Sequence, residues 1–210
     1  PGPARPRIPA LFTPPEPAGP AAPVLSTADR EAGLVGRVLG SSSGQFDVAA
    51  GSSLAPAAGT VHTVRIEVER GLAVDRDRFA AFVLTTLNDP RGWGHDGALS
   101  FARTDGHADL TVLLASPDTT ERLCRPLETG GVLSCRRHDR AVVTMHRWIN
   151  GSSDYAGDPT AYRRYVVNHE VGHWLGQGHV PCPEPGRPAP VMQQQTLGLQ
   201  GCLPNPWPHP

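Results

Sequence analysis

The stretch NHEVGHWLGQGHV, residues 168–180, constrains the fold of this chain more than any other part of its sequence. His169 and His173 are four residues apart, about one turn of an α-helix, so both imidazoles are expected to project from one helix face. After Gly176 the chain can turn sharply, because glycine tolerates positive φ angles, and bring His179 back toward that face. The spacing therefore predicts three imidazoles that converge on one point from two directions.

The helix that carries this stretch has clear end signals in the sequence. Asp158 is a good N-cap, and Pro159 suits the first helical position because no N–H donor is needed there. Gly176, just after Leu175, favours the left-handed conformation that commonly ends a helix. These signals predict a helix over residues 159–175.

Three converging histidines beside one carboxylate are typical of a catalytic zinc site. Zn²⁺ in such a site takes three protein ligands and leaves a fourth position for water. We expect His169, His173 and His179 to be the ligands. Glu170, about 100° round the helix axis from His169, is expected to be the catalytic general base. The pattern H-E-x-x-H-x-x-G-x-x-H specifies five positions, and chance gives it on the order of 10⁻⁷ times per start position. One catalytic zinc ion is thus the predicted cofactor.

The pattern resembles the zinc motif of the metzincin metallopeptidases. That family also carries a methionine in a tight turn beneath the metal, and Met192, thirteen residues after His179, matches it. The resemblance implies an α+β chain with a metzincin-like (zincin) fold: a mixed twisted sheet with two main helices, an active-site helix followed by a Met-turn, and a short C-terminal subdomain. It also implies that the thioether of Met192 packs under the imidazoles and does not bind the metal.

Residues from about 60 to 208 also resemble an uncharacterised secreted domain family of high-GC Gram-positive bacteria. Members of that family typically have an N-terminal signal or membrane anchor, which implies a signal or anchor segment upstream of Pro1. The resemblance supplies no substrate. It is carried by DPRGW (89–93), NHEVGHWLGQGHVPCP (168–183), APVMQQQT (189–196) and GCLPNPWP (201–208).

One position departs from the better-known metzincins. Several branches place a tyrosine two residues after the turn methionine, where it can contact the metal or the oxyanion, whereas this chain has Gln194. Outside the motif, six histidines lack ligand spacing and are expected at the surface or in packing, although His146 is left open as a residue that could line the cleft. The candidates for a second electrophilic group are Tyr155, Tyr162, Tyr165 and Arg147.

Composition divides the chain into two parts. Residues 1–35 are rich in Pro, Ala and Gly and lack apolar periodicity, which predicts a flexible linker or stalk. Residues 36–210 are assigned to the metzincin-like metallopeptidase domain. Within the Gly/Ser-rich residues 36–59, the short apolar piece Gln45–Ala49 fits either a hairpin packed on the domain or more linker.

Hydrophobic periodicity predicts the elements of an α+β domain with a single sheet. In VHTVRIEVE, Val64, Ile66 and Val68 alternate with polar residues, which is typical of a half-buried strand. Two later strands are expected to be joined as a hairpin by Asp105-Gly106. The predicted elements are a strand at 61–69, a helix at 75–89, strands at 98–104 and 109–116, a short helix at 117–124 and a strand at 140–150.

Four cysteines without a C-x-x-C pair favour two disulfides and an oxidising compartment. Three pairings exist on paper. Cys124–Cys135 and Cys182–Cys202 are preferred, because each closes a local loop. The alternative is four free, buried thiols in a cytosolic protein.

The sequence thus predicts a secreted or surface-tethered, monomeric zinc metalloendopeptidase whose peptide substrate pairs with an edge strand at 140–148. A net charge of −1 gives no sign of the basic surface that binds nucleic acid. The chain has no apolar run of the roughly 18 residues that a membrane span needs. Two alternatives remain: a non-catalytic zinc-stabilised cell-surface binding module, and a hydrolase of a cell-wall amide.

Overall fold

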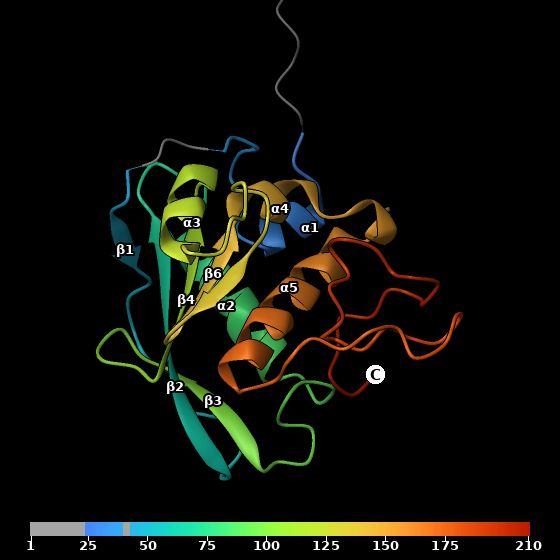
Figure 1. The fold of residues 1–210 in the computed structure, drawn as a ribbon. Coiled ribbons are helices and arrows are strands. Elements are labelled where there is room, and N and C mark those ends of the chain that lie inside the picture. The colour runs from blue at the N-terminus through green and yellow to red at the C-terminus, as the bar shows by residue number, and fades with distance from the viewer. Residues whose placement is uncertain (1–23, 40–42) are drawn as a thin grey trace, which may run out of the picture.

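The computed structural model describes residues 24–39 and 43–210, which contain one mixed sheet with helices on both faces (Figure 1). The strands lie in the order β1-β2-β4-β6-β5, and β3 pairs with β2 outside this path. The coarse prediction of an α+β chain with a single mixed sheet is confirmed. The strands are β1 (Phe46–Val48), β2 (Thr60–Glu69), β3 (Leu99–Arg103), β4 (Leu110–Ala115), β5 (Cys135–Arg137) and β6 (Arg140–Thr144). The helices are α1 (Thr27–Glu31), α2 (Arg76–Leu87), α3 (Pro117–Cys124), α4 (Met145–Asn150), a 3-10 turn (Ser153–Tyr155) and α5 (Pro159–Trp174).

Alternate residues of the central strand β4 face two separate apolar clusters. Val112 and Leu114 lie in the main core, which also contains residues of α2 and α5. Leu113 and Ala115 point to the opposite face, into a smaller cluster that contains Cys124 of α3. The sheet is therefore covered by α2 and α5 on one face and by α3 on the other.

The two strands on either side of Asp105-Gly106 do not form the predicted hairpin. β3 pairs in parallel with residues 60–64 of β2, and β4 pairs in parallel with residues 64–68. β3 and β4 therefore run in the same direction, and they pair with successive parts of the long strand β2. Asp109 helps to fix this path, because its carboxylate accepts hydrogen bonds from the N–H and the hydroxyl of Thr63, both at 2.8 Å.

The segment at 140–150 is a strand followed by a helix, and the prediction of one continuous strand is wrong. The hydroxyl of Thr144 accepts a hydrogen bond from the N–H of His146, so Thr144 ends β6 and caps α4. The prediction that 140–148 forms a sheet edge is also wrong, because β6 pairs with β4 on one side and with β5 on the other. Among the described residues, β5 is the strand at this end of the sheet.

Within the predicted linker over residues 1–35, the segment from Leu25 to Leu34 contacts the domain. α1 forms here, and Ala32 and Leu34 directly after it are buried in the main core. Two buried side chains are too few to give a periodic pattern in the sequence, although they are enough to pack this short segment against the main core. The first 23 residues of the predicted linker lie outside the described residues.

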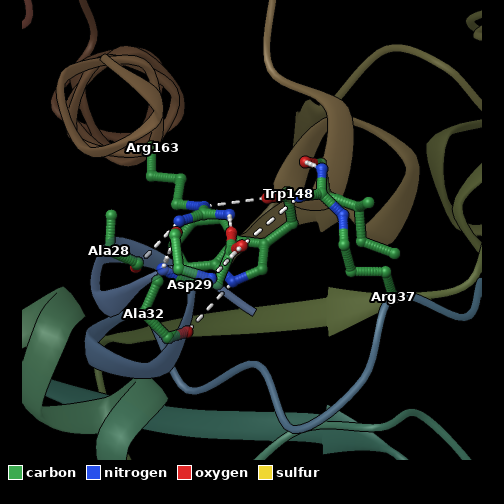
Figure 2. A network of polar contacts seen from close by, with 8 residues as sticks. Ala28, Asp29, Ala32, Arg37, Trp148 and Arg163 are labelled. Carbon is green, nitrogen blue, oxygen red and sulfur yellow. Dashed lines mark hydrogen bonds and ion pairs between the residues drawn. The ribbon is translucent and has the colours of Figure 1, made fainter. Parts of the chain in front are cut away.

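Asp29 of α1 forms a buried ion pair with Arg163 of α5, with oxygen and nitrogen 2.5 Å apart (Figure 2). The Asp29 carboxylate also completes a capping box with Ser26. Arg163 is 1% exposed and donates to the carbonyl oxygens of Ala28 and Trp148. Burial works against ionisation of Asp29, but the hydrogen bonds from Arg163 and Ser26 outweigh it and hold the pKa of Asp29 below its ordinary value. The N-terminal segment is thus fastened to α5.

Several local predictions are confirmed. Both preferred disulfides are present: Cys124–Cys135 joins α3 to β5, and Cys182–Cys202 closes the segment around Met192. The piece Gln45–Ala49 contains β1, which pairs antiparallel with β2. In the part of the chain that the structure describes, no helix has the length and apolar character needed to cross a bilayer.

Candidate metal centre

α5 forms where the sequence predicts it, from Pro159 to Trp174. The carboxylate of Asp158 accepts a hydrogen bond from the N–H of Ala161, which satisfies a free donor of the first turn. Gly176 adopts a φ of +88° just after the helix, where a side chain would be strained. The helix therefore presents His169 and His173 on its last turns, and the chain bends back immediately afterwards.

The three motif histidines converge in space. One ring nitrogen from each of His169, His173 and His179 lies within 4.8 Å of the other two. The Nε2 atoms of His173 and His179 are 3.0 Å apart. Nitrogen ligands of a tetrahedral zinc lie roughly 3.3 Å from one another, so small side-chain movements would bring all three into range. Within residues 24–39 and 43–210, no other group of three or more metal-ligating side chains meets in this way.

Backbone carbonyls orient the two helical histidines. Nδ1 of His169 lies 2.8 Å from the carbonyl oxygen of Val191, and Nδ1 of His173 lies 2.9 Å from that of Gln177. A carbonyl oxygen only accepts, so each Nδ1 carries the proton and each Nε2 keeps a free lone pair. This is the tautomer in which a histidine offers Nε2 to a metal.

Burial keeps two of these rings neutral. It lowers the pKa of His169 to about 3; the hydrogen bond with Val191 opposes this shift, and the neighbouring His173 and His179 add to it. The pKa of His179 is also lowered, first by burial and then by His173. Both rings are therefore uncharged near pH 7, which is the state that metal binding requires.

Glu170 lines the same cleft as the three histidines and is only 4% exposed. Burial raises the pKa of this carboxyl group to about 8, because the charged form loses its hydration. A dication held by the histidines would lower the pKa again, since a nearby positive charge favours the carboxylate. The group can therefore exist in either protonation state near neutral pH.

Gly172, between the two helical histidines, is required by close packing that the motif alone does not reveal. A Cβ at this position would collide with Sδ of Met192 and with the ring of Trp93. The indole N–H of Trp93 donates to the carbonyl oxygen of Asn168 at 3.0 Å, which holds the ring against α5. Met192 is buried, and its Sδ lies against Gly172 of the helix that carries the candidate metal ligands. Trp93 ends the segment DPRGW, but no sequence pattern predicts its contact with this helix.

Two of the tyrosines considered as electrophiles hold the segment that carries Met192. The hydroxyl of Tyr155 donates to Oε1 of Gln195 at 2.6 Å. The hydroxyl of Tyr165 donates to the carbonyl of Gln193 at 3.0 Å and accepts from the N–H of Gln195 at 2.9 Å. Both hydroxyls are buried in these contacts, so the structure gives them a supporting role.

The other two candidates, Tyr162 and Arg147, are also engaged in hydrogen bonds. The hydroxyl of Tyr162 lies 3.0 Å from that of Thr196. The guanidinium of Arg147 donates to the carbonyl oxygens of Val132 and Gly151. Neither residue lines the cleft. Tyr165 does line it, but its hydroxyl is held by Gln193 and Gln195, so no second electrophile is identified among the four candidates.

A cleft of about 320 Å³ opens beside the histidines. Its walls come from α5, from β5 with the loop before it, and from the segment after Met192. Gln194, which stands where the better-known metzincins have a tyrosine, is exposed in this cleft, whereas His146 does not line it. Aliphatic surface is provided by Leu127, Leu133, Val166 and Leu197.

Comparison with known proteins gives one match. The model of a family described as "Protein of unknown function (DUF3152)" matches residues 35–210. The matched region contains the whole sheet, α5 and the C-terminal segment, and it begins just after the buried Leu34. Neither a curated protein nor a solved structure matches the chain.

Proposed function

We propose that this chain, which belongs to the family of proteins of unknown function DUF3152, is a zinc-dependent endopeptidase with a metzincin-like site. The observation that carries the proposal is the convergence of three imidazoles beside a buried carboxyl group in one open cleft. A structural zinc site is normally closed by four protein ligands and has no need of such a carboxyl group. The geometry therefore favours catalysis over a binding module that zinc merely stabilises.

The donor set fits zinc. Imidazole nitrogens suit Zn²⁺, and three of them leave the open position that is typical of a catalytic site. The carbonyl oxygens of Val191 and Gln177 hold the rings of His169 and His173 in the orientation that offers Nε2. The packing of Met192 against Gly172 supports the likeness to the metzincin Met-turn.

Glu170 is the proposed general base. When bound, zinc would polarise the carbonyl of the scissile peptide bond and make water more acidic. Glu170 would take a proton from the attacking water and return that proton to the leaving nitrogen. Burial favours the protonated carboxyl group needed for the second transfer, and the metal's charge favours the carboxylate needed for the first.

An extended peptide would reach the site along β5. This strand is at the end of the sheet, and Cys135 and Arg136 line the cleft. A peptide in extended conformation can add to such an edge through backbone hydrogen bonds. The two disulfides support an oxidising, extracellular or cell-surface location for this activity.

The test compares the parent chain with Glu170→Gln and His173→Ala. Zinc content is measured by elemental analysis, and new peptide termini in a denatured protein mixture are identified by mass spectrometry. Glu170→Gln should keep its zinc and cut roughly 10²–10⁴ times more slowly, the usual contribution of positioned acid–base catalysis. His173→Ala should lose zinc and cleavage together.

Two outcomes would contradict the proposal. Full cleavage by zinc-loaded Glu170→Gln would show that Glu170 is not the base. A zinc-loaded parent that produces no new termini would favour a binding module, unless isolated cell walls incubated in parallel release amide-cleavage products.

A further inference from the structure

β5 brings an unpaired positive charge to the wall of the cleft. Arg136, the central residue of this strand, is exposed and lines the cleft together with Glu170 and the histidines. Among residues 24–39 and 43–210, no hydrogen bond or ion pair engages its guanidinium group. Arg136 is therefore free to contact a ligand.

Strand geometry explains why Arg136, and not the next residue, faces the cleft. Arg136 pairs with Ala141, and Cys135 pairs with Val142. Ala141 lies in the main core on the α5 side, whereas Cys135 and Val142 belong to the cluster on the α3 side. Because side chains alternate along a strand, Arg136 points to the α5 side and Arg137 to the opposite face.

The backbone of Arg136 also faces the free edge. β5 and β6 are joined by the two-residue turn His138-Asp139, in which His138 has a φ of +54°. The residues that flank such a turn, Arg137 and Arg140, form a hydrogen-bonded pair, so the N–H and C=O of Arg136 are directed away from β6. A peptide that adds to β5 would thus pair with the residue whose side chain lies in the cleft.

The charges around Arg136 favour an acidic ligand. Among the residues that the structure describes, Glu170 is the only one with a carboxyl group that lines the cleft, and it is assigned to proton transfer. Residues 136–140 read RRHDR, with three arginines and one carboxylate, so the edge hairpin has a net positive charge. Complementary charge selects partners and fixes their register, so this edge would discriminate against basic peptides.

Apolar surface adjoins this charge. Leu127 and Leu197 are 53% and 63% exposed, and both line the cleft. Exposed leucines in a concave wall gain free energy when a ligand side chain covers them. A ligand that matches the cleft therefore combines one apolar and one acidic side chain.

We propose that the cleft selects extended peptides that place an acidic side chain beside Arg136 and an apolar side chain against the leucine-lined wall. This inference rests on the proposed peptidase function, and it makes Arg136 a specificity-determining residue. It assigns no role to Arg136 in bond cleavage.

The test begins with a library of peptides from a digested proteome, incubated with the zinc-supplied parent chain. Cleaved sites should be enriched in Asp or Glu at one position near the broken bond. Matched peptides with Asp, Asn or Lys at that position are then compared. The Asp peptide should have a kcat/KM about fivefold above that of the Asn peptide, the upper range for a solvent-exposed ion pair.

Arg136→Glu should remove this preference and favour the Lys peptide. Arg137→Glu is the matched control, because it changes the net charge equally on the opposite face of the same strand, and it should leave the Asp/Asn ratio within about twofold of the parent value. The inference is overturned if no acidic enrichment is found, if the enrichment survives Arg136→Glu, or if Arg137→Glu abolishes it equally.

A parent chain that cuts no peptide would refute the peptidase proposal but would still leave this inference testable. Zinc-loaded protein is then titrated into fluorescent peptides that carry one leucine flanked on both sides by Asp, Asn or Lys. Anisotropy should give about fivefold tighter binding of the Asp peptide than of the Asn peptide, and only Arg136→Glu should abolish the difference. Equal affinities of the three peptides would overturn the inference.

Discussion

Gly172→Ala is expected to destabilise the domain, although alanine normally favours a helix by about 0.8–1 kcal/mol over glycine. The new methyl group would collide with Sδ of Met192 and the ring of Trp93. Overpacking of a buried site typically costs about 1–3 kcal/mol, and two simultaneous collisions place this site near the upper end. The net loss is then about 2 kcal/mol, or a fall in Tm of about 4–8 °C for a domain of this size.

The proposed metal centre should bind zinc more weakly in the same variant. A displaced Met192 would move Val191, whose carbonyl oxygen holds the ring of His169. Thermal unfolding and calorimetric titration with zinc would measure the two effects. Gly106→Ala is the control, because its Cβ would meet only Oγ1 of Thr104 at 3.5 Å, an ordinary contact, and its Tm should not fall.

A double mutant separates packing from other causes. Met192→Ala removes one of the two colliding groups, so Gly172→Ala should cost less in that background, with a coupling of about 0.5–3 kcal/mol. A Gly172→Ala chain as stable as the parent, with unchanged zinc affinity, would refute the reasoning. If the losses in the free energy of unfolding caused by the two substitutions simply add in the double mutant, the proposed collision is also contradicted.

Three further predictions concern the buried ion pair and the proposed metal centre. Asp29→Asn should cost about 3–5 kcal/mol near pH 7, since it leaves Arg163 buried without its ionic partner. The pKa of Asp29 in the folded chain is held below 3.8, so its contribution is fully present above that value and is lost as pH falls through the lower folded value. The free energies of unfolding of parent and variant, measured with urea, should therefore converge at low pH. A difference between them that does not change with pH would contradict the ion pair. Removal of zinc by a chelator should lower Tm, and added zinc should restore it. The pKa values of His169 and His179 are lowered, so their contribution to zinc affinity should fall only below about pH 6.5. Calorimetric titration with zinc at several pH values measures this. A zinc affinity that does not change down to pH 3 would argue against histidine ligation.

The parts of the fold that follow from local chemistry could be predicted from the sequence. α5 begins and ends as expected because the Asp158 cap, Pro159 and Gly176 act within a few residues of each helix end. The spacing of the histidines then brings them together once the helix and its turn form. Both disulfides close short loops, so their pairing was also accessible from the sequence.

The wrong predictions depend on contacts between distant residues. Residues 141–143 are apolar and fit a strand, and only the cap at Thr144 reveals that the strand gives way to a helix. Strand partners and sheet edges are decided by the whole sheet, so β5 could not be recognised as the edge from three residues. The requirement for Gly172 likewise arises from Trp93, which lies far away in the sequence.

The ion pair between α1 and α5 also has a consequence for the order of folding. Asp29 and Arg163 are 134 residues apart, so their contact closes one of the longest loops in the chain. Contacts of such sequence separation form late, because chain entropy must be lost before they contribute. During synthesis α1 leaves the ribosome long before its partner exists. The helix that carries His169 and Glu170 is seated against α1 only after that loop closes, so we expect the proposed metal centre to assemble late in folding.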